Sequence, residues 1–189
     1  MKNFKSIAMA LLVAFGTAAA TAQTKKVDVQ KSNISWVGKK VTGQHEGTVN
    51  LQEGALIFKG KKLTGGNFTV NMNSITVTDL REDQGKVKLE GHLKADDFFG
   101  TDKYPTAALN FKKVTANADN SYNVVADMTL KGITKPVTFV LVVNNNTATT
   151  TFYIDRTNYD IKYKSASIFS GLGDASIHDD FEVKAVLVF

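Results

Sequence analysis

The chain contains no cysteine. Disulfides, thiolate metal sites, cysteine nucleophiles and lipid-modified cysteines are therefore excluded. Only three histidines are present, His45, His92 and His178, and they lie far apart in the sequence. Cysteine and histidine are common metal ligands and common members of catalytic triads. With no cysteine and three histidines, the chain has few candidates for either kind of site. A domain built from this chain must be stabilised by its apolar core, since no covalent cross-link is available.

No long run of one charge sign occurs either. The 23 Lys and Arg residues outnumber the 18 Asp and Glu residues by five. Lysine doublets occur at residues 25–26, 39–40, 61–62 and 112–113, where they are interleaved with acidic residues. They form no basic stripe with stacking aromatics, so we expect no nucleic-acid partner.

The first 22 residues have the pattern of a cleavable export signal. Lys2 and Lys5 precede an apolar run at residues 7–15, and Ala20-Thr21-Ala22 fits the small-residue cleavage pattern. A retained anchor helix is the alternative, but the apolar run is short for a bilayer-spanning helix. We predict a signal peptide at residues 1–22 and an exported domain at residues 23–189.

Beyond residue 23, apolar and polar residues alternate along most of the chain, as is typical of half-buried strands. The clearest runs are residues 68–73, 122–131, 152–157 and 181–189. Short segments rich in Gly, Asn and Asp separate such runs. No linker or internal repeat divides the sequence. The pattern predicts a single all-β domain of antiparallel strands.

Residues 82–99 interrupt this alternation. Leu89 and Leu93 are four residues apart, as on one face of a helix, and Asp96-Asp97 resembles a helix N-cap. A strand through Val87 and Leu89 is the alternative. We predict a short helical segment near residues 82–99 that covers one end of the sheet.

An open sheet of about eight strands would leave two exposed edges, and closure into a barrel removes them. The interior of an eight-stranded barrel is just wide enough for packed side chains or for one slender ligand. We therefore predict a single closed antiparallel β-barrel of about eight strands.

Three sequence blocks together resemble the YceI-like family of exported proteins. They are residues 91–99 followed by Lys103-Tyr104-Pro105-Thr106, then residues 128–137, and then residues 154–161 with Asp179-Asp180-Phe181 before the last strand. The resemblance implies a lipocalin-like barrel with a small helical part. It also implies a non-enzymatic protein that binds polyisoprenoids, isoprenoid quinones or fatty-chain amphiphiles in the periplasm. Residues 39–40, 44–46 and 171–174 depart from the family pattern, which bears on the identity of the ligand.

The apolar faces of the alternating strands supply candidate ligand contacts. The predicted set is Trp36, Phe68, Val70, Met72, Leu109, Phe111, Met128, Leu130, Phe139, Leu141, Phe152, Ile154 and Arg156. These side chains either fill one another's space or line a pore, and the resemblance favours the pore. Trp36 lines that pore or plugs one end. Arg156 shares its strand face with Phe152 and Ile154, so it pairs with an acidic residue such as Asp180 or meets a polar headgroup.

We predict no catalytic residue, no metal site and no cofactor. The bound molecule that we expect is the lipid ligand. His92 with Asp96 and Asp97 has the residue types of acid–base catalysis, but packing against a short helix is the simpler interpretation. His178, Asp179 and Asp180 are adjacent, and adjacent strand residues point to opposite faces, so they do not converge on a metal.

The sequence thus predicts binding, storage or transport of a long apolar molecule, with that lipid as the small-molecule partner. Transient contact with a membrane surface is also expected, and nothing in the sequence specifies an oligomeric state. One alternative is an integral outer-membrane barrel, because alternation alone does not say which face meets lipid. A less favoured alternative is a lipid-acting hydrolase or isomerase that uses His92 and Asp97.

Overall fold

The computed structural model describes residues 21–189, so the predicted signal peptide lies outside the described residues except for its last two positions. The strands are β1 (Ala22–Lys26), β2 (Asn33–Lys40), β3 (Gly43–Lys59), β4 (Lys62–Val77), β5 (Thr106–Ala116), β6 (Ser121–Leu130), β7 (Ile133–Asn144), β8 (Thr147–Asp155) and β9 (Ile177–Val188). One α-helix, α1 (Lys86–Lys94), and three 3-10 turns, η1 (Glu82–Gln84), η2 (Arg156–Tyr159) and η3 (Gly173–Ala175), complete the described elements.

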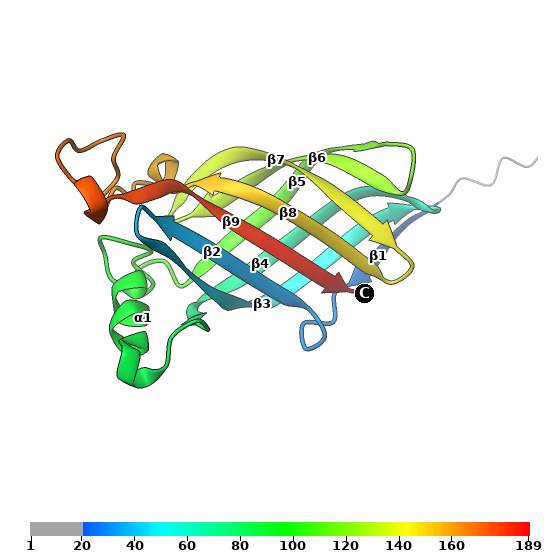
Figure 1. Ribbon diagram of the computed structural model, residues 1–189. Helices are drawn as coiled ribbons and strands as arrows, with labels where there is room; N and C mark the ends of the chain where they lie inside the picture. Colours follow the sequence, from blue (N-terminus) through cyan, green and yellow to red (C-terminus); the bar gives the residue numbers. More distant parts are fainter. Residues whose placement is uncertain (1–20) are drawn as a thin grey trace, which may run out of the picture.

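Strands β2 to β9 form a closed antiparallel barrel in which each strand pairs with the strands before and after it in the chain (Figure 1). The cylinder closes where β2 pairs with β9, from Asn33 opposite Val186 to Lys40 opposite Ile177. Strand β1 is additional and pairs with the second half of β3. The prediction of a single antiparallel barrel of about eight strands is confirmed.

A two-residue turn between β6 and β7 shows how local sequence sets these connections. Lys131 and Gly132 have φ angles of +52° and +74°, and Leu130 lies opposite Ile133 across the turn. Positive φ at both central positions is the requirement of the hairpin turn that follows the right-handed twist of the strands. Glycine meets it without strain.

Helix α1 lies at one end of the barrel, next to the segment of residues 160–176, and the C-terminus lies at the other end (Figure 1). Glu90 fixes the helix to β4, because its Oε1 accepts hydrogen bonds from the Thr76 hydroxyl at 2.6 Å and the Val77 amide at 2.9 Å. The predicted helical segment is confirmed, and the alternative strand through Val87 and Leu89 is wrong. Among residues 21–189, no helix is long and apolar enough to cross a membrane.

Three glycines on the inner wall allow aromatic rings from the neighbouring strand to lie flat against the sheet. A Cβ atom on Gly47 would lie 2.6 Å from the Trp36 ring, and one on Gly54 would lie 2.6 Å from the Phe68 ring. A Cβ atom on Gly66 would lie 2.9 Å from the Phe111 ring. Each ring therefore occupies the space of a missing side chain, which keeps it on the wall and away from the barrel axis.

The tightest of these contacts yields a stability prediction. In Gly47→Ala the new methyl group would lie 1.8 Å from the Thr76 carbonyl oxygen as well as against Trp36, so β3 or the indole must move. We expect the free energy of unfolding, measured by urea denaturation, to fall by about 1–3 kcal/mol.

Gly91→Ala is the matched control. Gly91 lies inside α1, and a Cβ atom there has no neighbour within 4 Å. We expect this substitution to raise the free energy of unfolding by about 0.5–1 kcal/mol, because alanine loses less backbone entropy on folding. A Gly47→Ala protein as stable as the wild type would contradict the assigned contact.

Candidate ligand-binding site

The barrel encloses two apolar cavities that share part of their walls. The larger cavity, of about 190 Å³, lies at the α1 end, and the smaller, of about 80 Å³, lies deeper in the barrel. Five side chains border both cavities: Ile34, Val70, Ala107, Met128 and Val183. The two cavities therefore lie next to each other along the barrel interior, and we call them together the channel and each one a segment of it. A dry apolar cavity of roughly 150 Å³ is enough to bind a benzene-sized molecule, so the larger segment has room for an apolar ligand.

The structure places all of the predicted contact residues on this channel. Trp36, Met72, Leu130, Ile154 and Arg156 line the larger segment, Phe68, Leu109, Phe111, Phe139, Leu141 and Phe152 line the smaller, and Val70 and Met128 line both. Their contact with a ligand stays a prediction. The agreement in position arises because side chains two residues apart on a strand share a face.

Further lining residues were not predicted. Helix α1 and the turn after it contribute Leu89, Leu93, Phe98 and Phe99, and β9 contributes Ile177, Phe181, Val183, Ala185 and Leu187. The alternation along β9 was a usable signal for the inward residues of that strand. The contribution of α1 depends on where the helix lies against the barrel end, which its own sequence does not specify.

Aromatic rings form one side of the deeper segment. Phe139 and Phe152 are stacked with ring centroids 4.8 Å apart, and Phe111 contacts Phe139 at 5.7 Å. Phe68 lies 5.5 Å from Phe111. Met128, at the junction of the two segments, has an unbranched thioether side chain that adapts to irregular apolar neighbours. This wall suits a flexible hydrocarbon chain.

Trp36 lies in the wall of the larger segment, with its ring against Gly47. The sequence left open whether Trp36 lines the pore or plugs one end, and its position in this wall is the one expected for lining. The indole Nε1 is buried and has no hydrogen-bond partner among residues 21–189.

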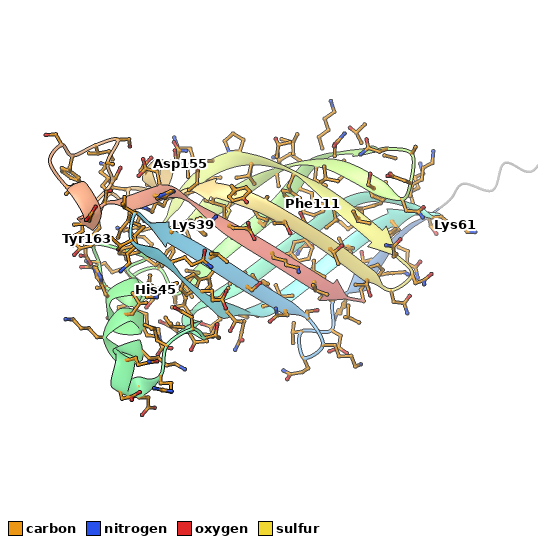
Figure 2. All side chains as sticks on the ribbon, in the orientation of Figure 1. Lys39, His45, Lys61, Phe111, Asp155 and Tyr163 are labelled. Carbon is orange, nitrogen blue, oxygen red and sulfur yellow. The ribbon has the colours of Figure 1, made fainter. Side chains whose placement is uncertain are left out.

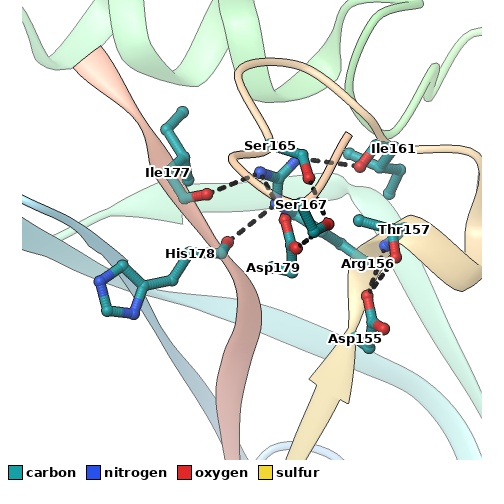
Figure 3. A network of polar contacts seen from close by, with 9 residues as sticks. All are labelled: Asp155, Arg156, Thr157, Ile161, Ser165, Ser167, Ile177, His178 and Asp179. Atoms are coloured by element: carbon teal, nitrogen blue, oxygen red, sulfur yellow. Dashed lines mark hydrogen bonds and ion pairs between the residues drawn. The ribbon is translucent and has the colours of Figure 1, made fainter. Parts of the chain in front are cut away.

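Arg156 lines the larger segment, and Figure 3 shows its polar contacts. Its guanidinium donates hydrogen bonds to three backbone carbonyls, those of His178 at 3.0 Å, Ile161 at 2.8 Å and Ile177 at 3.1 Å. Its Nη2 also lies 3.5 Å from Asp179 Oδ1. With 3% of its surface exposed, Arg156 ties β9 to the chain that follows β8.

The expectation that Arg156 pairs with an acidic residue such as Asp180 was wrong in its partner. Asp179 shares the inward face of β9 with Ile177 and Phe181, whereas Asp180 is exposed and lies opposite Asp155. The predicted partner was one residue away from the actual one. Which residues of β9 face inward is set by the pairing of β9 with β2 and β8, which are distant in sequence from each other.

The arginine and aspartate shift each other's ionisation. Burial lowers the pKa of Arg156, against the opposing effect of the charges on Asp179 and Asp155. Partial burial acts to raise the pKa of Asp179, but hydrogen bonds from Ser165 and Ser167 and the charge on Arg156 outweigh it. The pKa of Asp179 therefore lies below its ordinary value, and the carboxylate is charged at neutral pH.

The candidate acid–base pair, His92 and Asp97, does not face the channel. His92 Nε2 lies 3.0 Å from Asp97 Oδ2, and the His92 ring packs against Phe98 and Tyr163. Neither His92 nor Asp97 lines either cavity. Within the described part of the chain, no three His, Asp or Glu side chains come together as a metal site.

The lowered pKa of Asp179 predicts part of the acid sensitivity of the fold. Between the folded pKa and the ordinary value near 3.8, the folded protein binds fewer protons than the unfolded chain, so stability rises with pH there. The contribution is complete above that value and is lost as the pH falls through the folded pKa. We expect Asp179→Asn to be destabilised most at neutral pH and to approach the wild type below about pH 4.

Urea denaturation at several pH values measures this difference. The control is Asp102→Asn, because Asp102 is exposed and has no hydrogen bond or ion pair among residues 21–189. A gap between Asp179→Asn and the wild type that stayed constant from pH 7 to pH 3 would contradict the assigned role of the Asp179 charge.

Comparisons with known proteins agree with this architecture. A family model described as the YceI-like domain matches residues 26–189. A UPF0312 protein of Yersinia enterocolitica is 30% identical over 135 residues, which cover 69% of this chain and 66% of that protein. A UPF0312 protein of Shewanella denitrificans is 32% identical over 92 residues, which cover 49% of this chain and 46% of that protein. The chain thus spans between about half and two thirds of the length of these relatives.

Solved structures with low sequence identity share the fold. Burkholderia cenocepacia BcnA superposes with a TM-score of 0.67 at 24% identity, over 86% of this chain and 99% of that one. A polyisoprenoid binding domain from Saccharophagus degradans gives a TM-score of 0.59 at 14% identity, over 86% of this chain and 95% of that one. The Campylobacter jejuni YceI protein gives 0.52 at 13% identity, over 100% and 99%. With the family model matching nearly all of the described chain, the protein belongs to the YceI-like domain family.

Proposed function

We propose that the protein binds a long apolar molecule in its channel and stores or transports it in the periplasm, without catalysing a reaction on it. The ligand class is a polyisoprenoid, an isoprenoid quinone or a fatty-chain amphiphile. The observation that carries the proposal is the channel itself, two adjacent segments inside a closed barrel, lined mainly by apolar side chains. The description of the Saccharophagus degradans neighbour as a polyisoprenoid binding domain supports it.

The energetics of such a channel favour a long, slender ligand. Burying each CH₂ group contributes about 0.8 kcal/mol, so affinity grows with the length of chain that the channel covers. Side chains that border a cavity have contact partners on one side only, and a hydrocarbon chain lying there adds the missing dispersion contacts.

The two alternative functions have less support. A membrane-embedded barrel carries an apolar band on its outer face. Here exposed positions on β4 and β9 carry polar and charged side chains, including Asn67, Asn73, Asp180 and Lys184. A hydrolase or isomerase that uses His92 and Asp97 would need these groups beside the ligand, and neither lines the channel.

A charge placed at the junction of the two segments tests the channel. Met128 borders both segments, so the lysine in Met128→Lys must bury its ammonium group, at a cost of several kcal/mol, or displace the ligand. We expect native mass spectrometry of delipidated protein, reloaded with a long-chain prenol, to show loss of the bound species.

Thr129→Lys is the matched control on the same strand. The Thr129 hydroxyl lies 2.7 Å from that of Thr134 at an exposed position, and Thr129 lines neither segment. A lysine there remains in solvent, and we expect normal loading. Equal loading of both variants, each with a wild-type circular dichroism spectrum, would refute the channel as the binding site.

We further propose that the α1 end of the barrel makes transient contact with the membrane from which the ligand comes. Val41, Val87, Ile168 and Phe169 are exposed on the β2–β3 turn, α1 and the loop before β9. The Val41 amide donates to the Ser176 carbonyl at 3.3 Å, which holds that turn beside the loop. Exposed apolar side chains around the open end of a lipid channel suit insertion among headgroups.

Vesicle flotation measures this contact. We expect the double substitution Ile168→Ser and Phe169→Ser to reduce flotation with phosphatidylglycerol vesicles several-fold. Val140→Ser is the control, since Val140 on β7 is as exposed (48%) as Phe169 (49%). If the Val140 variant lost as much flotation as the double variant, the contact would not be specific to this end.

A further inference from the structure

The charged side chains on the channel wall all have one sign. The titratable residues that line the larger segment are Lys39, Lys40, His45, Arg156 and His178. No aspartate or glutamate of the described chain borders either segment, and the deeper segment has no charged residue at all. The channel therefore runs from a basic mouth to an uncharged interior.

Of these five basic groups, Arg156 and His45 already have partners, and the side chain of His178 lies apart from the Arg156 network. The Arg156 guanidinium is held by three backbone carbonyls and Asp179. His45 Nδ1 lies 2.8 Å from Asp79 Oδ2. The side chain of His178 points away from the Arg156 network (Figure 3).

Lys39 and Lys40 remain available. Both are exposed at the end of β2, and within residues 21–189 no carboxylate lies within 4 Å of either ammonium group. Lys40 follows Gly38 on the same face of β2, and Gly38 borders the larger segment without a side chain to fill it. Both lysines border that segment as well.

Two acidic groups on or beside the strands that pair with β2 are engaged in other contacts. Asp79 accepts the Glu46 amide at 3.0 Å in addition to its contact with His45. Glu182 accepts the Tyr153 hydroxyl at 2.7 Å. Neither carboxylate pairs with Lys39 or Lys40.

We propose that the ligand has an anionic headgroup, a carboxylate or a phosphate, which Lys39 and Lys40 bind at the mouth while its apolar tail occupies the channel. This inference rests on the proposed function and specifies the ligand class. Hydrogen bonds between an ammonium group and an anionic oxygen are stronger than those between neutral groups. Because the lysines are exposed, salt screens the interaction, and it adds to the larger contribution of the tail.

Ligand pairs that differ only in the headgroup test this proposal. Oleic acid is compared with oleyl alcohol, and geranylgeranyl phosphate with geranylgeraniol, by displacement of a fluorescent apolar probe from delipidated protein. At low salt we expect the anionic member of each pair to bind about two- to fivefold more tightly. We expect the preference to decrease at high salt.

The double substitution Lys39→Gln and Lys40→Gln should abolish the preference for the anionic member of each pair. Its control is Lys61→Gln with Lys62→Gln, a doublet at the β3–β4 turn, and Figure 2 shows Lys61 at the far end of the barrel from Lys39 and His45. This variant should keep the wild-type preference. Inorganic phosphate alone should displace no probe.

The possible failures are distinguishable. Equal affinity of the wild type for acid and alcohol, or a preference that survives in the Lys39→Gln, Lys40→Gln protein, would overturn the headgroup inference and leave the proposed function intact. Displacement by inorganic phosphate alone would overturn it as well, by marking the lysines as a site for free anions. Failure of all four compounds to bind the wild type would overturn the proposed function and this inference together.

Discussion

The pairing of β2 with β9 is the interaction on which the rest of the structure depends, because it joins the first and last strands of the barrel into a closed cylinder. Without it, the two strands would be open edges able to pair with other chains. The apolar side chains of the inner face would then pack against one another and leave no space between opposite walls. Closure fixes the distance between opposite walls, and that fixed distance makes a channel possible.

The width of that channel depends on residues that are not on its surface. Gly47, Gly54 and Gly66 receive the rings of Trp36, Phe68 and Phe111, so these large side chains lie along the wall. Side chains in place of the glycines would push the rings toward the axis, where they would fill the space themselves. The glycines thus lower the local stability of their strands, and in return the interior of the barrel remains partly open.

The sequence predicted the wall of the channel better than its ends. Two-residue periodicity places Met128, Phe139 and Ile154 on the inner face without any tertiary information. The ends depend on contacts between distant segments, such as the hydrogen bonds from Arg156 to the carbonyls of Ile161 and Ile177. No local pattern encodes those contacts, so the partner of Arg156 was predicted one residue away from its true position. The helix was predicted at one end of the sheet, but the side chains that α1 contributes to the channel were not foreseen.

Ligand contacts with the channel wall and ligand contacts at its mouth contribute differently to recognition, because their binding free energies differ in size. A tail of several CH₂ groups contributes about 0.8 kcal/mol for each group, whereas an exposed ion pair contributes roughly 0.2–1 kcal/mol in total. Length of the apolar chain therefore sets affinity, and the groups at the mouth set the choice among ligands of equal length. Changes at residues such as Lys39 and Lys40 alter selectivity without disturbing the core, since both side chains are exposed at the end of β2. A single barrel can in this way serve ligands with different headgroups.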